Sequence, residues 1–168
     1  MIKIRSNVFE TNSSSVHSIV ITKSPTEPEK FINFSIGKFG WEFNELTTPR
    51  EKASYFYTAA CSLLERDILD EIGNKLLNYG IGAYSTNRAA FKLDGEYTWL
   101  ENGYIDHVEE LENWVNDLMN DIDKLIRFIF NDESFIVTGN DNCDESAYDW
   151  MKNKLVRANN YEHELIRK

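Results

Sequence analysis

A hairpin signal in the middle of the chain constrains the fold most. Residues 91–93 (FKL) and 96–99 (EYTW) are short runs rich in apolar and β-prone side chains, and Asp94-Gly95 stands between them. An Asp-Gly pair between two such runs is a strong signal for a tight turn that joins antiparallel strands. The pattern therefore predicts a β-hairpin, and with it antiparallel pairing in the fold.

Two long helices are expected, one on each side of this hairpin. Thr48, Pro49 and Glu51 have the pattern of a capping box with proline in the first helical position. A helix should follow that fades by Gly80 and is bent or split at Gly73. The second helix runs from about residue 107 to residue 130. Its apolar stripe consists of Val108, Leu111, Val115, Leu118, Ile122, Leu125 and Ile129.

Short strands are expected around these helices, at residues 1–5, 16–22, 31–36 and 134–138. A turn at residues 139–142, a third helix at 145–157 and a polar tail would complete the chain. We therefore predict an α+β fold, in which two long helices and a shorter C-terminal helix pack against a mainly antiparallel sheet. A length of 168 residues is typical of one domain, so residues 1–168 should form a single domain.

The charge of the chain restricts its partners. Lysine and arginine number 18 against 28 aspartates and glutamates, which gives a formal net charge of -10 at pH 7. Such a protein repels nucleic-acid phosphates at long range and is steered toward basic surfaces, for example those of nucleic-acid-binding proteins. The alternative is that the acidity only keeps the protein soluble.

The sequence predicts a soluble, cytoplasmic protein that does not interact with membranes. No apolar run approaches the ~18–20 residues that span a bilayer, and the chain turns polar directly after its first five residues. Cys61 and Cys143 lack the spacing of metal ligands, and we expect them to be reduced thiols.

Polar groups that could support chemistry are concentrated in residues 5–18 (RSNVFETNSSSVHS). His17 can exchange a proton near neutral pH, Glu10 could orient it, and Arg5 could bind a phosphate or stabilise a developing negative charge. Substrate contacts in this hypothesis come from Asn12, Ser13, Ser14 and Ser15. The alternative is that the segment is a serine-rich turn and that His17 is a strand residue facing solvent.

A second histidine stands at the expected start of the second long helix. Asp106-His107 would lie where backbone N–H groups and the helix dipole favour an anion. If this end meets residues 5–18, His17 and His107 could act as an acid–base pair on a phosphodiester. In RNA the 2′-hydroxyl would be the nucleophile, so such cleavage would need no metal. The alternative makes Asp106 the helix N-cap and His107 an exposed residue of the first turn.

The same helix begins with carboxylates and reaches its first cation only at Lys124. An acidic face of this kind could imitate a phosphate backbone and bind a basic channel. The residues that we assign to this partner-binding face are Glu109, Glu110, Glu112 and Asp117.

No cofactor is expected from the sequence. A weaker alternative is a divalent cation at Asp141, Asp144 and Glu145, which could support metal-dependent cleavage. A carboxylate-rich turn before a helix more often serves capping and solvation.

Residues 8–18 (VFETNSSSVHS) resemble the N-terminal signature F-E-T-N-S-S-S-x-H-S of proteins from phages and mobile elements of low-GC Gram-positive bacteria. Residues 103–107 (GYIDH) and 139–142 (GNDN) resemble two later, shorter motifs of those proteins. Some proteins of this general kind are counter-defence factors, including anti-CRISPR inhibitors of Cas9. The resemblance thus implies a bacterial cytoplasm, a basic nucleic-acid-binding partner such as Cas9, and guide RNA as a substrate.

Three functions remain open at this point. The first is a ribonuclease-like cleavage of guide RNA by residues 5–18 together with Asp106 and His107. The second is a non-enzymatic acidic mimic of nucleic acid that occupies a basic channel of its target. The third is a phage regulatory protein whose polar loop binds a small molecule or peptide.

Overall fold

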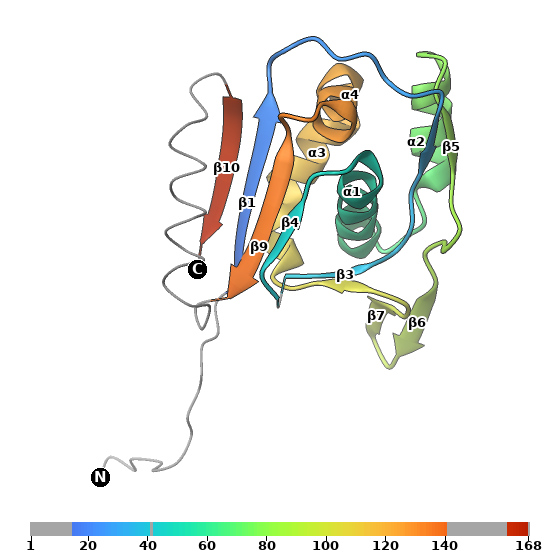
Figure 1. The fold of residues 1–168 in the computed structure, drawn as a ribbon. Coiled ribbons are helices and arrows are strands. Elements are labelled where there is room, and N and C mark those ends of the chain that lie inside the picture. The colour runs from blue at the N-terminus through green and yellow to red at the C-terminus, as the bar shows by residue number, and fades with distance from the viewer. Residues whose placement is uncertain (1–14, 41, 141–160, 168) are drawn as a thin grey trace.

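The computed structural model describes residues 15–40, 42–140 and 161–167. One layer of the fold is a four-stranded sheet with the strand order β10-β1-β9-β4, in which every neighbouring pair is antiparallel (Figure 1). These strands are β1 (Ser15–Thr22), β4 (Asn44–Leu46), β9 (Phe135–Asn140) and β10 (Tyr161–Arg167). The predicted α+β class with antiparallel pairing is confirmed.

Helices form the second layer, with α1 (Pro49–Leu64) at its centre. In Figure 1, α1 lies between the sheet on one side and α2 (Leu69–Leu77) on the other. Every residue of α1 from Lys52 to Cys61 is buried, because α3 (Glu112–Asn120), α4 (Ile122–Phe130) and the strands surround it. None of the described helices combines the length and the apolar character that crossing a bilayer requires.

Three small strand pairs complete the described fold. β2 (Phe31–Asn33) pairs with β5 (Gly82–Tyr84), and β3 (Lys38–Phe39) pairs with β8 (Tyr104–Ile105). Both of these pairs are parallel, which the sequence did not indicate.

The predicted hairpin is confirmed as β6 (Phe91–Asp94) and β7 (Tyr97–Leu100). Its turn lies one residue later than expected, because Asp94 pairs with Tyr97 and leaves Gly95 and Glu96 as the two central residues. Gly95 has a φ of 63°, a left-handed conformation that glycine adopts without steric cost.

The predicted capping box at the start of α1 is confirmed. The Thr48 hydroxyl accepts a hydrogen bond from the backbone N–H of Glu51, and the Glu51 carboxylate accepts one from the N–H of Thr48. The interruption expected at Gly73 is wrong, because α1 ends at Leu64 and Gly73 lies inside α2. An added Cβ on Gly73 would lie 3.5 Å from Cβ of Ala83, an ordinary van der Waals distance, so the packing of α2 on β5 does not require a glycine here.

The prediction of one continuous helix from about residue 107 to residue 130 is also wrong. This region consists of the 3-10 helix η1 (Val108–Leu111), α3 and α4. The break falls at Asp121, which leaves helical geometry and accepts a hydrogen bond from the N–H of Lys124 as the N-cap of α4. A short acidic side chain that bonds to nearby backbone competes with the helix in this way. The apolar stripe is still directed inward, since Leu111, Leu118 and Leu125 are fully buried.

Two strand boundaries differ from the predictions, and one strand was not predicted. The strand expected at residues 31–36 ends at Asn33, and β9 continues through Gly139 and Asn140, where a turn was expected. The C-terminal segment, expected to be a polar tail, contributes strand β10, which pairs with β1 along its length. The strand expected at residues 1–5 and the helix expected at 145–157 lie outside the described residues.

Candidate functional site

A polar row crosses the helix-facing side of the main sheet. His17 on β1 stands opposite Thr138 on β9, which stands opposite Asn44 on β4. Residues that face each other across neighbouring strands point to the same side of a sheet. On strands β1, β9 and β4, the next row on this side is formed by Ile19, Ile136 and Leu46, which are apolar and buried. The polar row therefore marks the point where the apolar core gives way to a site with hydrogen-bonding groups.

His17 is fully buried in this row and makes hydrogen bonds with both of its ring nitrogens. Its Nε2 lies 2.9 Å from the backbone oxygen of Asp106, and its Nδ1 lies 2.7 Å from the hydroxyl of Tyr55 on α1. A carbonyl oxygen can only accept, so Nε2 must carry the proton. Nδ1 of the neutral ring then accepts the hydrogen bond that the Tyr55 hydroxyl donates.

Burial determines the charge state of this pair. The pKa of His17 is lowered from 6.5 to about 4, mainly because burial removes solvation from the charged ring, and the nearby His107 acts in the same direction. The hydrogen bond to the Asp106 carbonyl and the Asp106 charge oppose this shift only in part. Burial also raises the pKa of the Tyr55 hydroxyl well above its usual value. Both groups are therefore uncharged near neutral pH.

The strand pair β3–β8 holds the Asp106 carbonyl over His17. The backbone N–H of Asp106 donates to the oxygen of Phe39 at 3.1 Å. Gly40, which follows, has a φ of 110°, and a Cβ there would lie 2.9 Å from Cβ of Asp106 and 3.0 Å from Cε1 of His17. A side chain at position 40 would therefore push the Asp106 carbonyl away from the His17 imidazole, to which it is hydrogen-bonded.

A small pocket opens beside this cluster. Its volume is about 200 Å³, and it is lined by Lys38, Phe39, Gly40, Glu42, Asn44 and Tyr104. Gly40 both lines this pocket and approaches Cε1 of His17, so the imidazole lies close to one wall of the pocket. A lysine, a carboxylate, a carboxamide and a phenol could bind a small polar group here.

The structure brings together some of the residues that the sequence singled out. His17 and Asp106 do meet, but Asp106 holds the imidazole through its backbone carbonyl. The predicted helix N-cap at Asp106 is wrong, because the residue before η1 is His107, which has a φ of 51° and makes no capping bond. Nδ1 of His107 lies 3.7 Å from a carboxylate oxygen of Glu109. The alternative of a solvent-facing His17 is wrong as well, because the ring is buried.

The four residues of the predicted acidic face lie on η1 and α3 rather than on one long helix. Glu109, Glu112 and Asp117 are exposed, whereas Glu110 is half-buried. Asp117 forms an ion pair with Lys124 of α4. The remaining predicted site residues, Arg5, Glu10, Asn12, Ser13, Ser14, Asp141, Asp144 and Glu145, lie outside the described residues, and of Ser15 only the backbone is described, at the start of β1.

Sequence reasoning missed Tyr55, Gly40 and Lys52. Tyr55 and Lys52 lie on the central helix α1, which is buried on all sides, so the one-sided apolar pattern of a surface helix did not single them out. Nζ of Lys52 donates to the backbone oxygens of Asn131 and Ser134 at 2.7 and 2.8 Å. Burial lowers its pKa to about 8.

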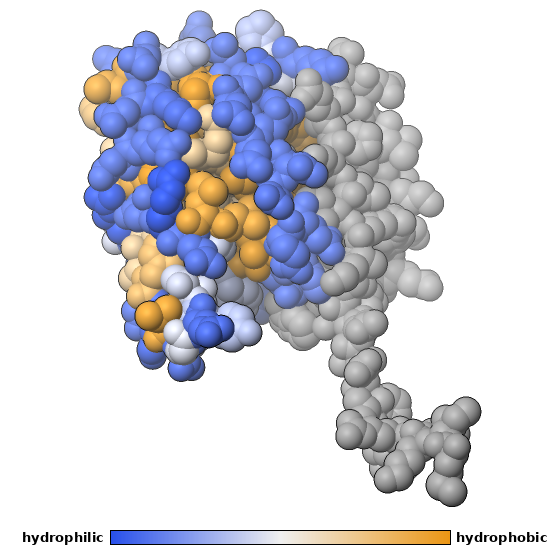
Figure 2. All heavy atoms as spheres, turned by 180° about the vertical axis from the view of Figure 1, so that it is seen from behind, coloured by the Kyte–Doolittle hydropathy of each residue, from blue (hydrophilic) through white to orange (hydrophobic). Residues whose placement is uncertain are grey.

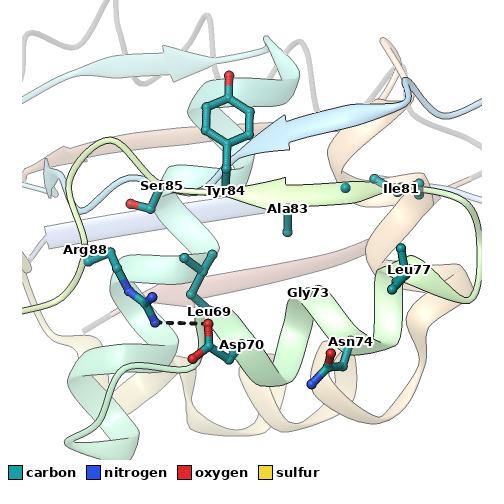
Figure 3. A pocket seen from close by; sticks show the side chains of 11 residues that line it. Leu69, Asp70, Gly73, Asn74, Leu77, Ile81, Ala83, Tyr84, Ser85 and Arg88 are labelled. Carbon is teal, nitrogen blue, oxygen red and sulfur yellow. Dashed lines mark hydrogen bonds and ion pairs between the residues drawn. The ribbon is translucent and has the colours of Figure 1, made fainter.

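A second hollow lies between α2 and β5 and has a volume of about 580 Å³ (Figure 3). Leu69, Leu77 and Ala83 contribute apolar surface to it, and Arg88 stands at one end. The Arg88 guanidinium already forms ion pairs with Asp67 and Asp70. This hollow is open and offers no uncommitted charge for a ligand, so we place the candidate site at His17. In the part of the chain that the structure describes, no group of three or more histidine, cysteine and acidic side chains could hold a metal ion.

Comparisons with known proteins found no matching family model, no matching curated protein and no matching solved structure.

Proposed function

We propose that this protein is a non-catalytic acidic binding protein that occupies a basic surface of its partner. The observation that carries this proposal is the acidic ridge, defined as the solvent-facing side of η1 and α3 with Glu109, Glu112 and Asp117. No lysine or arginine occurs in residues 101–123, but Lys124 of α4 pairs with Asp117 and offsets part of the negative charge of the ridge. The side chain of Glu109 is 69% exposed and that of Asp117 is 53% exposed.

The packing of α3 explains why these carboxylates face outward. Trp114, Val115 and Leu118 are buried on its inner side, and Glu112 and Asp117 lie outside this set, at the surface. The ridge thus presents negative charge on a rigid element rather than on a loop. With a net charge of -10 in addition, long-range attraction to a cationic surface is expected.

The resemblance of residues 8–18 to a phage signature supports a counter-defence role, with a Cas9-type complex as the target. Cas9 holds its nucleic acids in a positively charged channel, which is the kind of surface that an acidic ridge would occupy. In this proposal the protein blocks DNA cutting without altering the guide RNA.

The test is to incubate the purified protein with a Cas9–guide RNA complex, then to measure DNA cutting and to size the guide on a denaturing gel. We expect inhibited cutting, an intact guide, and binding that weakens as salt is raised. The variant Glu109→Gln/Glu112→Gln/Asp117→Asn should lose most of the inhibition. Glu27→Gln/Glu29→Gln is the control for the loss of negative charge, because these exposed carboxylates lie between β1 and β2 and not on η1 or α3. Equal inhibition by both variants would refute the role of the ridge.

Guide-RNA cleavage is the second candidate function, because His17 does lie against Asp106 and near His107, as that hypothesis requires. Against it, the ring is neutral, buried and hydrogen-bonded through both nitrogens, so proton transfer would first need these contacts to open. A guide that wild type shortens and folded His17→Gln leaves intact would favour this candidate. Glutamine retains a donor and an acceptor in a similar place, so it keeps the variant folded.

A further inference from the structure

The β6–β7 hairpin projects from the body of the protein at the lower right of Figure 1. Only its base is anchored, where Leu100 is buried and its partner Phe91 is half-buried. Figure 2 shows the hairpin as a separate lobe at the lower left, with hydrophobic and hydrophilic side chains at its surface. The rest of the hairpin is thus held by its own turn and ladder, and its tip is open to a partner.

Large side chains at the tip are left exposed. Tyr97 is 77% exposed, Leu93 is 70% exposed and Trp99 is 43% exposed. Tyr97 and Trp99 share one face of the hairpin, since they stand two residues apart on the same strand. Their cross-strand partners on that face are Asp94 and Lys92.

The face that carries Tyr97 and Trp99 presents two large aromatic side chains to solvent. Single exposed apolar residues are common at protein surfaces, but Tyr97 and Trp99 place two large aromatic side chains side by side on one face of a short hairpin, while Leu93 lies on the other face. Tryptophan and tyrosine are the residues that most often carry the binding energy of protein interfaces. The tip therefore has the composition of a binding surface rather than of a structural turn.

The charged residues around these aromatic side chains indicate which kind of partner they favour. Asp94 and Glu96 at the turn and Glu101 at the end of β7 are all exposed, and the one cation among them is Lys92. Arginine and lysine side chains stack on tryptophan and tyrosine faces and are attracted by neighbouring carboxylates. Nucleic acid also stacks on aromatic side chains, but its phosphates are repelled by this acidic surround.

We infer that the tip of the β6–β7 hairpin docks onto an arginine- and lysine-rich protein surface, with Tyr97 and Trp99 as its anchors. This role rests on the proposed function and deepens it, because it adds a short-range contact to the long-range attraction of the acidic ridge. The acidic ridge is charged and the hairpin contact is aromatic, so mutations can test the contribution of each surface to binding separately.

The first experiment follows Trp99 fluorescence, taken as the difference between wild type and Trp99→Phe. We expect an octa-arginine peptide to change this signal, and an octa-glutamate peptide or a single-stranded oligothymidine to leave it unchanged. A change caused by oligothymidine alone would overturn the inference in favour of nucleic-acid stacking. No change with octa-arginine would overturn it as well.

The second experiment compares binding to the Cas9–guide complex for wild type, Tyr97→Thr/Trp99→Thr and the control Phe31→Thr. Threonine keeps a high strand propensity, and Phe31 is an exposed aromatic residue of another strand pair, at 67% exposure. We expect about tenfold weaker binding only for the hairpin variant, a typical loss for interface anchors. Equal binding by all three proteins would overturn the hairpin inference and leave the proposed function standing. If none of them binds the complex while octa-arginine still perturbs Trp99, the proposed target is wrong and the hairpin inference stands.

Discussion

The hydroxyl of Tyr55 lies 2.7 Å from Nδ1 of His17, and this contact joins the central helix α1 to the central strand β1. It also selects one tautomer of the imidazole, in which Nε2 carries the proton and donates to the Asp106 carbonyl. Three segments that are distant in the chain are thereby connected by one buried and one partly buried hydrogen bond.

Removing the Tyr55 hydroxyl should destabilise the protein. In Tyr55→Phe the buried Nδ1 of His17 loses its donor, and an unsatisfied buried acceptor costs about 1–3 kcal/mol. Urea unfolding of Tyr55→Phe should therefore show a lower midpoint with an unchanged slope. Tyr84→Phe is the control, because Tyr84 is 50% exposed. Equal midpoints for the two variants would contradict the structural role of this bond.

Stability should fall in acid because His17 is buried in its neutral form. Its pKa is about 4 in the folded protein and 6.5 as the ordinary value, so the unfolded chain binds more protons between these pH values. The free energy of unfolding then increases with pH across this window, and lowering the pH from 6.5 to 4 should remove about 3 kcal/mol of it. Urea midpoints at several pH values measure this change.

His17→Gln is the control for this pH dependence. Glutamine does not titrate, so the component of acid destabilisation between pH 6.5 and 4 should disappear from the variant. A variant that loses stability as steeply as wild type would show that other groups cause the acid sensitivity.

Gly40→Ala should destabilise the protein by more than an alanine substitution at a glycine that has a positive φ but no close neighbours. The new Cβ would approach both Asp106 and His17 to 3.0 Å or less, at a φ of 110°. Gly80→Ala is the matched control, because Gly80 has a φ of 76° and no atom within 4 Å of an added Cβ. Backbone strain alone costs about 1–3 kcal/mol, and Gly40→Ala should exceed the loss measured for Gly80→Ala. Equal thermal midpoints would show that the cluster can expand without cost.

Replacing the buried Lys52 should loosen the connection between α1 and the turn that follows α4. In Lys52→Met the Asn131 and Ser134 carbonyls lose their shared donor, at a cost of about 1–3 kcal/mol. Lys23→Met, at an exposed position, should have little effect. Chemical unfolding measures both, and a stable Lys52→Met would imply that apolar packing compensates for the lost hydrogen bonds.

Elements whose structure depends only on neighbouring residues could be predicted from local patterns in the sequence. The capping box needs only Thr48 and Glu51, and the β6–β7 hairpin needs only a glycine turn between two short strands. Both were predicted, apart from a shift of one residue in the turn. The helix break at Asp121 was missed because its capping bond competes closely with continuation of the helix. Strand β10 was missed because its polar sequence becomes a strand only through pairing with β1.

The sequence by itself determined the α+β class, the start of α1, the hairpin and the negative charge, because each depends on composition or on neighbours in the chain. It also identified His17 and Asp106 as residues of interest. Only the tertiary structure decided that His17 is buried and neutral, because its partners are 38 and 89 residues away. Desolvation by segments that meet only in the folded state sets the charge of the imidazole. No local pattern around residue 17 contains that information.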